Sequence, residues 1–328
     1  MSRPKMFGAG SGLVALACAV AIGVGGSALA AAKKGTLGVS MPNIKGPWFT
    51  PILYGITDEA KKLGYEVIIQ DAGGYGNVDK QVTQMENLIV KKVTAILQDP
   101  ANPASFNGVV RQAKAARIPV IGAGSPIVAS EVAADAASSS SHCSIGHELA
   151  KGAMKLLPKG GKIAVLAGPP GAFWASDRLR CFKDDIKSTA IKIVAEQTSE
   201  QDAAVALSLA NDFLQRHPDL DLLYGADDTY GVGAARAAQG AGKCGKVKVL
   251  FAVLGETAEE MMRAKCADYV VAQQPVLIGR TAVRMADALV QKKPLEKKLV
   301  EIPLIPVTPA NLNSVNKSTI QAPKGWTP

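Results

Sequence analysis

The sequence TLGVSMPNIKGPWFTPILYGITDEAKKLGYEVIIQ, residues 36–70, contains the pattern that decides the fold. Two apolar, largely β-branched runs, Thr36–Met41 and Glu66–Gln70, flank a segment in which apolar residues recur at helical spacing through 52–63. Apolar runs without polar alternation are typical of parallel strands covered on both faces. The stretch therefore predicts a strand–helix–strand unit, with Gly64 ending the helix.

The same alternation continues along the chain. Further strands are predicted at Val93–Gln98, Pro119–Gly122, Lys162–Ala167, Ile191–Glu196, Leu220–Tyr224, Val247–Val253 and Tyr269–Ala272, with amphipathic helices between them. This order implies parallel sheets with right-handed crossovers. The length of 328 residues exceeds one typical domain. The sequence therefore predicts an α/β protein of two Rossmann-like lobes.

Three segments are candidates for crossings between the lobes. The stretch at 129–144 (ASEVAADAASSSSHCS) is small and polar and is interpreted as a linker, Gln273-Gln274-Pro275 follows a strand, and Pro303–Pro309 is rich in proline. The expected lobes are 34–139 plus 275–303, and 140–274 plus 304–328, joined by a three-segment hinge. Ligands of open α/β sheets bind at the carboxyl ends of the strands, so the loops there are expected to face one cleft.

The first 30 residues have the layout of a cleaved signal peptide. Arg3 and Lys5 precede an uncharged apolar run that ends in Ala28-Leu29-Ala30. A membrane anchor, or a lipoprotein modified at Cys18, is the alternative. We therefore expect export to the periplasm and a mature chain without a membrane span.

Composition narrows the choice of partners. The net charge is +9, but the lysines stand in pairs at predicted helix ends, which does not indicate a nucleic-acid partner. The mature chain keeps four cysteines, Cys143, Cys181, Cys244 and Cys266. An even count in an oxidising compartment permits two disulfides. A Cys244–Cys266 bridge is favoured because each residue precedes a predicted strand, and free buried thiols are the alternative.

Aromatic and polar residues gather in the loops that follow the strands. The candidate ligand-binding residues are Trp48, Phe49, Tyr75, Asp99, Phe173, Trp174, Asp227 and Gln273. Aromatic faces can stack on a sugar or enclose a methylated ammonium group, whereas the carboxylates can hold hydroxyls. The alternatives are that the rings cap the lobe cores and that the aspartates cap helices. Arg178 and Arg180 are interpreted as solvated or salt-bridged.

Signals for catalysis are weak. His142, Cys143 and His147 lie close enough in sequence to suggest a metal site, but no second cluster accompanies them. The loop 168–171 lacks the Lys-Ser/Thr ending of a phosphate-binding loop, and Gly73-Gly74 is not a dinucleotide fingerprint. We expect no enzyme activity, no cofactor and no metal.

The motifs at the strand ends resemble those of type I periplasmic binding proteins, in particular the ribose-binding-like group. The resemblance rests on Pro47-Trp48-Phe49, Gln98-Asp99-Pro100, Asp227-Asp228 and Ala272-Gln273-Gln274-Pro275, in order along about Thr36 to Pro309. It implies two lobes that close around a small molecule.

The chain departs from the sugar binders at three positions. Gly122-Ala123-Gly124 replaces their Asp-Arg pair, their cleft arginine falls on Ser176, and their aspartate falls near Leu254. The grip on a monosaccharide is therefore predicted to be largely missing.

The loops Pro42–Phe49, Gly73-Gly74-Tyr75 and Gly168–Trp174 are similar to those of the TorT type, the periplasmic partners of trimethylamine-N-oxide sensor kinases. This similarity implies that Trp48, Tyr75 and Trp174 enclose the ligand. A fourth aromatic is expected near Val253, where Phe251 is the nearest ring.

These features predict a monomeric periplasmic receptor that captures a small polar molecule for the permease of an ABC importer. The alternative is a sensing partner of a membrane histidine kinase with a methylated amine oxide as its ligand. An enzyme with Rossmann-like lobes is the remaining alternative. A sugar-responsive repressor would need an N-terminal DNA-binding helix-turn-helix where the signal peptide stands.

Overall fold

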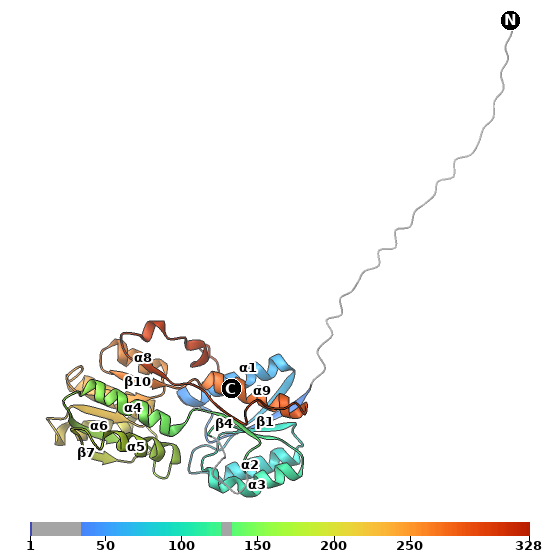
Figure 1. The fold of residues 1–328 in the computed structure, drawn as a ribbon, viewed down its shortest axis with the longest axis horizontal. Helices are drawn as coiled ribbons and strands as arrows, with labels where there is room; N and C mark the ends of the chain where they lie inside the picture. The colour runs from blue at the N-terminus through green and yellow to red at the C-terminus, as the bar shows by residue number, and fades with distance from the viewer. Residues whose placement is uncertain (2–33, 126–132) are drawn as a thin grey trace. The chain divides into compact units, whose positions relative to one another are not determined.

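The computed structural model describes Met1, 34–125 and 133–328 (Figure 1). Apart from Met1, the predicted signal peptide lies outside the described residues. Within the described part of the chain, no helix has the length and apolar character needed to cross a bilayer.

Two sheets of six strands form the framework. The first sheet has the order β11-β5-β4-β3-β1-β2 and the second β12-β10-β9-β8-β6-β7. Their strands are β1 (Gly35–Met41), β2 (Tyr65–Asp71), β3 (Ala95–Gln98), β4 (Val120–Gly124), β5 (Ala136–Ser139), β6 (Gly161–Leu166), β7 (Ile191–Gln197), β8 (Leu222–Gly225), β9 (Lys248–Ala252), β10 (Tyr269–Ala272), β11 (Leu299–Glu301) and β12 (Ile305–Val307). All neighbours pair in parallel except β10 and β12. The predicted α/β class with two parallel sheets is confirmed.

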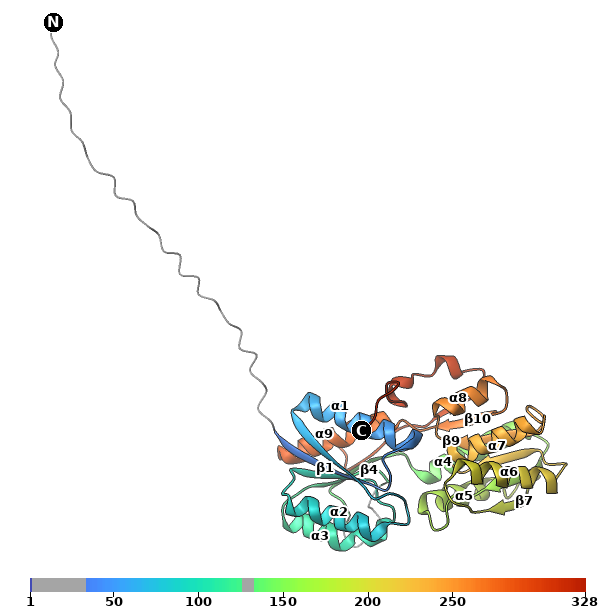
Figure 2. The same ribbon diagram turned by 180° about the vertical axis from the view of Figure 1, so that it is seen from behind.

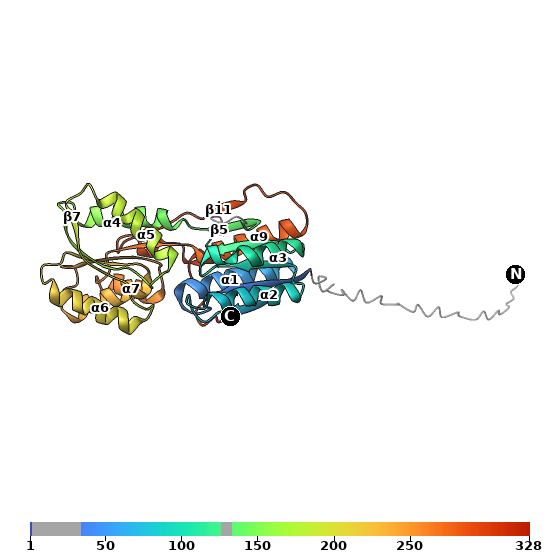
Figure 3. The ribbon, with the colours of Figure 1, turned by 90° about the horizontal axis from the view of Figure 1, so that it is seen from below.

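Helices cover both faces of each sheet. They are α1 (Gly46–Leu63), α2 (Val78–Val90), α3 (Asn107–Ala115), α4 (His142–Leu156), α5 (Phe173–Ile186), α6 (Ala203–Arg216), α7 (Asp228–Gly240), α8 (Glu256–Arg263) and α9 (Pro275–Val290), with short 3₁₀ turns at Pro103–Phe106, Leu312–Ser314 and Lys317–Thr319. Helices α1 and α9 cover one face of the first sheet and α2 and α3 the other (Figure 1). In the second sheet, α4 and α5 lie opposite α6 and α7 (Figure 3).

The first helix shows how the predicted pattern becomes a core. Ile52, Ile56 and Ala60 share one face of α1 and are fully buried against Ile278 and Ala282 of α9. As predicted, the helix stops at Gly64, whose φ of 85° is left-handed and whose N–H bonds back to the last turn. Helices α1 and α9 are thus packed together although more than 200 residues of the chain separate them.

The segment 129–144 corrects the sequence analysis. Interpreting all of it as a linker was wrong, because Ala136–Ser139 forms the buried strand β5, paired with β4 and β11. Small alanine and serine side chains fit a strand that is covered closely by α9, and this composition gives no apolar run to recognise. The crossing itself is reduced to Ser140 and Ser141, and α4 begins at His142.

The three connections between the sheets are hydrogen-bonded to one another. Ser140 Oγ donates to the carbonyl of Ile302 at 3.0 Å, and Gln274 Nε2 donates to the carbonyl of Pro303 at 2.9 Å. Strand β11 belongs to the first sheet and β12 to the second, so the third crossing is at 302–304. We keep 34–139 with 275–303, and 140–274 with 304–328, as the proposed boundaries of the two lobes.

A candidate ligand-binding cavity

A small cavity lies where the carboxyl ends of the two sheets face each other. Its volume is about 30 Å³, and it is lined by Trp48, Phe49, Tyr75, Asp99, Ser125, His142, Trp174, Arg178, Gln201, Asp227 and Val253. Residues from both sheets contribute to the lining, as expected for loops that follow parallel strands.

Aromatic rings form a continuous wall across this cavity. Trp48 and Phe49 lie in the first turn of α1, in which Pro47 is the second residue. The Tyr75 ring centroid is 6.1 Å from that of Phe49 and 6.1 Å from that of Trp174, so Tyr75 bridges the first lobe to the second. These separations are those of interacting aromatic pairs. The rings of the two lobes therefore meet at one place.

Asp99 joins the aromatic wall to the first sheet. It follows β3, is only 2% exposed, and accepts hydrogen bonds from Trp48 Nε1 at 3.1 Å and from the backbone N–H of Ser125 at 2.9 Å. Gly124 makes room for it, because a Cβ at that position would lie 2.8 Å from the Asp99 carboxyl. Burial raises the pKa of Asp99, and the hydrogen bonds from Trp48 and Ser125 oppose the shift.

Arg178 is the main correction to the predicted site. Interpreting it as a solvated or salt-bridged residue was wrong: it is 4% exposed and its guanidinium donates to the carbonyl of Ala226 at 2.9 Å and to Gln273 Oε1 at 3.3 Å. The guanidinium also lies 4.7 Å from the ring centroid of Trp174, one helical turn earlier on α5. Burial lowers its pKa, and the nearby carboxylate of Asp227 opposes that shift. Arg180, by contrast, is exposed and paired with Asp177.

Asp227 has two roles that the sequence analysis treated as alternatives. It is the N-cap of α7, where Oδ1 accepts from the N–H groups of Thr229 and Tyr230, and it also lines the cavity. Its other oxygen accepts a hydrogen bond from Gln201. Burial raises the pKa of Asp227, and the positive charge of Arg178 opposes the shift. The carboxylate is therefore fixed in position beside Arg178.

His142 connects the cavity to the hinge. As the first residue of α4 it is 7% exposed, and its Nε2 lies 3.2 Å from Oγ of Ser125 in the other lobe. Burial, and secondarily Arg178, hold its pKa well below the usual range, so the ring is neutral near pH 7. Among the described residues, His142 Nδ1, Arg178 Nε and Gln273 Nε2 are buried without a hydrogen-bond partner.

The structure brings six of the eight predicted residues to the cavity wall. Gln273 stands behind Arg178 rather than at the surface of the cavity, and Phe173 contacts the edge of His142 at 5.2 Å and lines an outer pocket of about 450 Å³. Arg178, His142, Ser125, Gln201 and Val253 were not predicted as ligand contacts. Arg178 could have been predicted from the sequence, because residues four apart in a helix share a face and Trp174 was already a candidate.

Sugar contacts were predicted to be largely missing, and the structure places polar side chains from other positions in the cavity lining. Ser176 is exposed, and its hydroxyl donates to the Phe173 carbonyl, but Arg178 supplies a guanidinium from the same helix. Asp99 reaches the space left by Gly124. Phe251 is a core residue beneath Gly231, so it does not complete an aromatic cage, and Val253 takes its place in the lining with a strained φ of 73°.

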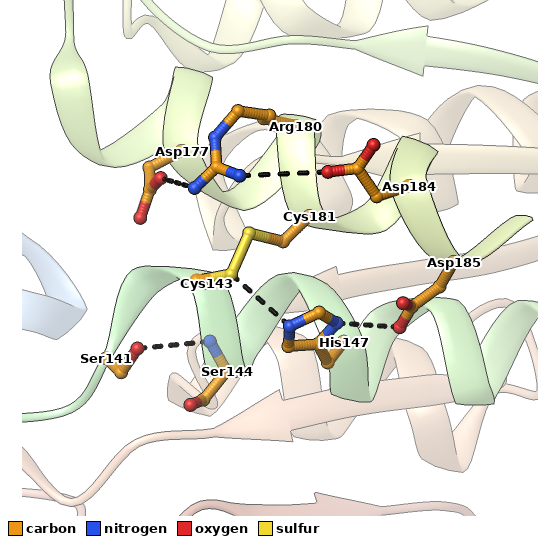
Figure 4. The surroundings of a disulfide bond; sticks show 9 residues. All are labelled: Ser141, Cys143, Ser144, His147, Asp177, Arg180, Cys181, Asp184 and Asp185. Carbon is orange, nitrogen blue, oxygen red and sulfur yellow. Dashed lines mark hydrogen bonds and ion pairs between the residues drawn. A yellow bond between two sulfur atoms is a disulfide. The ribbon is translucent and has the colours of Figure 1, made fainter.

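Two disulfides stabilise the second lobe. Cys244–Cys266 is confirmed, and Cys143 pairs with Cys181, joining α4 to α5 (Figure 4). His147 lies beside this bond, with Nε2 3.3 Å from Cys143 Sγ and Nδ1 2.7 Å from Asp185. Cys143, His147 and Cys181 would resemble a metal-binding set if the thiols were free. Because the two sulfurs are bonded to each other, the described cluster offers a single ligand nitrogen.

Two parallel-dominated sheets, joined by three crossings and both contributing residues to one cavity, are the features of a two-lobed binding protein. Comparison with known families agrees: residues 37–294 match the model described as a periplasmic binding protein domain. The chain belongs to this family of periplasmic binding proteins.

Individual relatives cover nearly the whole chain. The ribose import binding protein of Bacillus subtilis is 30% identical over 81% of this chain and 85% of its own length. The D-allose-binding periplasmic protein of Escherichia coli is 31% identical over 85% of this chain and 93% of its own. Among solved structures, an ABC transporter solute binding protein from Agrobacterium vitis with bound D-fucose matches with a TM-score of 0.82 and 25% identity, covering 88% of this chain and all of that one.

Proposed function

We propose that the chain is the solute receptor of an ABC importer and binds a monosaccharide or a closely similar polyol. The observation that carries this proposal is that aromatic rings line the same cavity as Asp99, Arg178 and Asp227. A sugar presents an apolar ring face and hydroxyls that both donate and accept. Aromatic faces, carboxylates and a guanidinium match these features in turn.

The relatives support the same ligand class, since their names refer to ribose, allose and fucose. A cavity of about 30 Å³ is much smaller than the several hundred Å³ of a usual ligand pocket. Binding a sugar therefore requires the lobes to separate and the ring of Tyr75 to move aside. We further propose that the chain is exported to the periplasm, loses residues 1–30, acts as a monomer and catalyses no reaction.

The second candidate is a sensor-kinase partner that binds a methylated amine oxide, in line with the TorT-like loops. The aromatic series Phe49, Tyr75 and Trp174 favours it. The Arg178 guanidinium lies 4.7 Å from the centroid of the Trp174 ring, so this ring face is already occupied and is not open to the methylated nitrogen of such a ligand. The sugar receptor is therefore the better supported function.

A thermal-shift panel tests the choice. Mature protein would be heated with D-ribose, D-allose, D-fucose, myo-inositol, trimethylamine N-oxide, betaine or choline. A ligand at a hundred times its Kd stabilises by about 2.7 kcal/mol, which raises the melting temperature by several degrees. We expect a shift with at least one sugar or polyol and its loss in Trp174→Ala. A shift with the methylated amines alone would reject the sugar proposal.

A further inference from the structure

The C-terminal segment leaves the second lobe and ends on the first. Its 3₁₀ turns pack on the second lobe, where Leu312 and Ile320 are each 2% exposed within the core. Beyond them the chain runs across to α1 and α9, beside which it ends in both views (Figures 1 and 2). The proposed boundaries place 304–328 in the second lobe, but Trp326 packs on the first, so this segment crosses between the lobes in addition to the three hinge crossings.

The anchor on the second lobe is polar. Lys317 pairs with Glu259 of α8, and Gln321 Nε2 donates to Glu259 Oε1 at 2.7 Å and to the carbonyl of Leu254 at 3.2 Å. Leu254 adjoins Val253 of the cavity lining. The anchor is therefore attached to the loop that follows β9.

The anchor on the first lobe is aromatic. Trp326 packs edge-on against Tyr54 of α1, with ring centroids 5.5 Å apart, and joins the apolar cluster of the first lobe. The Arg280 guanidinium lies 5.7 Å from the centroid of the same Tyr54 ring. Trp326 thus lies on a surface built from α1 and α9.

Between the anchors, the lobes touch directly. A Cβ on Gly255 would lie 2.8 Å from Cβ of Pro47, so the absence of a side chain at Gly255 permits this approach. The segment Gln321–Trp326 lies alongside the contact and shares a pocket of about 340 Å³ with Pro47, Gly255 and Asp228. Five residues extend at most about 17 Å, so wide separation of the lobes must detach one anchor.

We propose that residues 321–328 form a strap that holds the lobes in the closed arrangement. The strap is attached to both lobes only when Pro47 and Gly255 are close. Its release accompanies opening, and its loss shifts the protein toward open forms whatever solute it carries. The strap therefore sets how readily the receptor opens to exchange its ligand.

The test needs no ligand. Trp326→Ala and a truncation after Gln321 would be compared with wild type by small-angle X-ray scattering and by hydrogen exchange of the loops at 44–49 and 253–257. We expect a larger radius of gyration and, in the 253–257 segment of the second lobe as well as at 44–49, exchange that is faster by about twofold to tenfold, the range that corresponds to one aromatic pair. Trp326→Phe keeps a ring and Lys324→Ala changes an exposed neighbour, so both should behave as wild type.

A different set of results would reject the proposed strap. If Trp326→Ala lowers the melting temperature and speeds exchange only within the first lobe, α1 included, while the scattering curve and exchange at 253–257 stay unchanged, Trp326 merely stabilises the first lobe and the strap is rejected. Gly255→Ala provides a positive control for opening, because its methyl group would collide with Pro47. None of these outcomes depends on which solute the protein binds.

Discussion

The indole nitrogen of Trp48 donates a hydrogen bond to the buried carboxylate of Asp99 over 3.1 Å. One wall of the cavity and its acidic group are therefore positioned by each other. The ring cannot turn without leaving a carboxylate oxygen unpaired, and the carboxylate cannot turn without releasing the ring.

Trp48→Phe should weaken binding although an aromatic face is kept. Loss of the N–H removes a hydrogen bond to a charged group, so we expect a cost of about 1.5–3 kcal/mol in binding of the sugar that gives the largest thermal shift. Titration calorimetry measures this. Trp48→Ala should reduce the binding free energy further, because the aromatic face is lost as well. If Trp48→Phe binds with wild-type affinity, the hydrogen bond from Trp48 to Asp99 does not organise the site.

Arg178 and Arg180 form a matched pair for stability. Arg178→Ala leaves the buried carbonyl of Ala226 and Oε1 of Gln273 without their donor, so we expect a loss of about 1–3 kcal/mol in the free energy of unfolding. Arg180→Ala on the exposed face of the same helix should change it by less than about 0.5 kcal/mol. Urea denaturation of both variants gives the comparison. Equal effects would contradict the structural role given to Arg178.

His142 should make stability depend on pH. Its pKa is lowered in the folded protein, so the unfolded chain takes up the proton first as pH falls below about 6.5. The stability that the neutral His142 contributes to the folded protein is therefore fully present above that pH. Below it, the free energy of unfolding falls by at most about 1.4 kcal/mol per pH unit.

The raised pKa values of Asp99 and Asp227 increase the free energy of unfolding as pH falls, which is opposite to the effect of His142, because both carboxylates are protonated more easily in the folded state. The measurement is therefore the difference between wild type and His142→Gln in urea denaturation from pH 7.5 to 5. The Gln variant should gain on wild type as pH falls, and parallel curves would count against a buried neutral His142.

The two disulfides should contribute similar amounts of stability. Their sequence separations are 38 for Cys143–Cys181 and 22 for Cys244–Cys266. Chain-entropy arguments give about 3–4 kcal/mol for each loop. Denaturation of Cys143→Ser/Cys181→Ser and of Cys244→Ser/Cys266→Ser should show losses of this size. An unchanged free energy of unfolding in either double variant would mean that the bond does not restrain the unfolded chain.

Periodicity and composition were sufficient to predict the two sheets and the positions of most strands. They failed where side chains are small, as in β5, and where strands have three residues, as in β11 and β12. Such segments form strands because their neighbours supply the hydrogen-bonding edges, which local sequence does not reveal.

The site was predicted less completely than the fold. Loops after strands identified Trp48, Tyr75 and Asp99 because parallel strands place their ends together. Arg178 and His142 lie within helices, and their burial depends on how the second lobe meets the first. A charged residue flanked by Asp177 and Leu179 resembles an exposed helical position until that packing is known.

The first lobe is built from two stretches of sequence that are far apart, and this affects the order in which it can fold during synthesis. A nascent polypeptide that ends at Ser139 already contains β1 to β5, yet α9 and β11 are still to be synthesised. Until they arrive, Ile52 and Ile56 lack the neighbours that bury them. The first lobe can therefore complete its folding only after almost the entire polypeptide has been synthesised. The isolated fragment 34–139 is expected to aggregate.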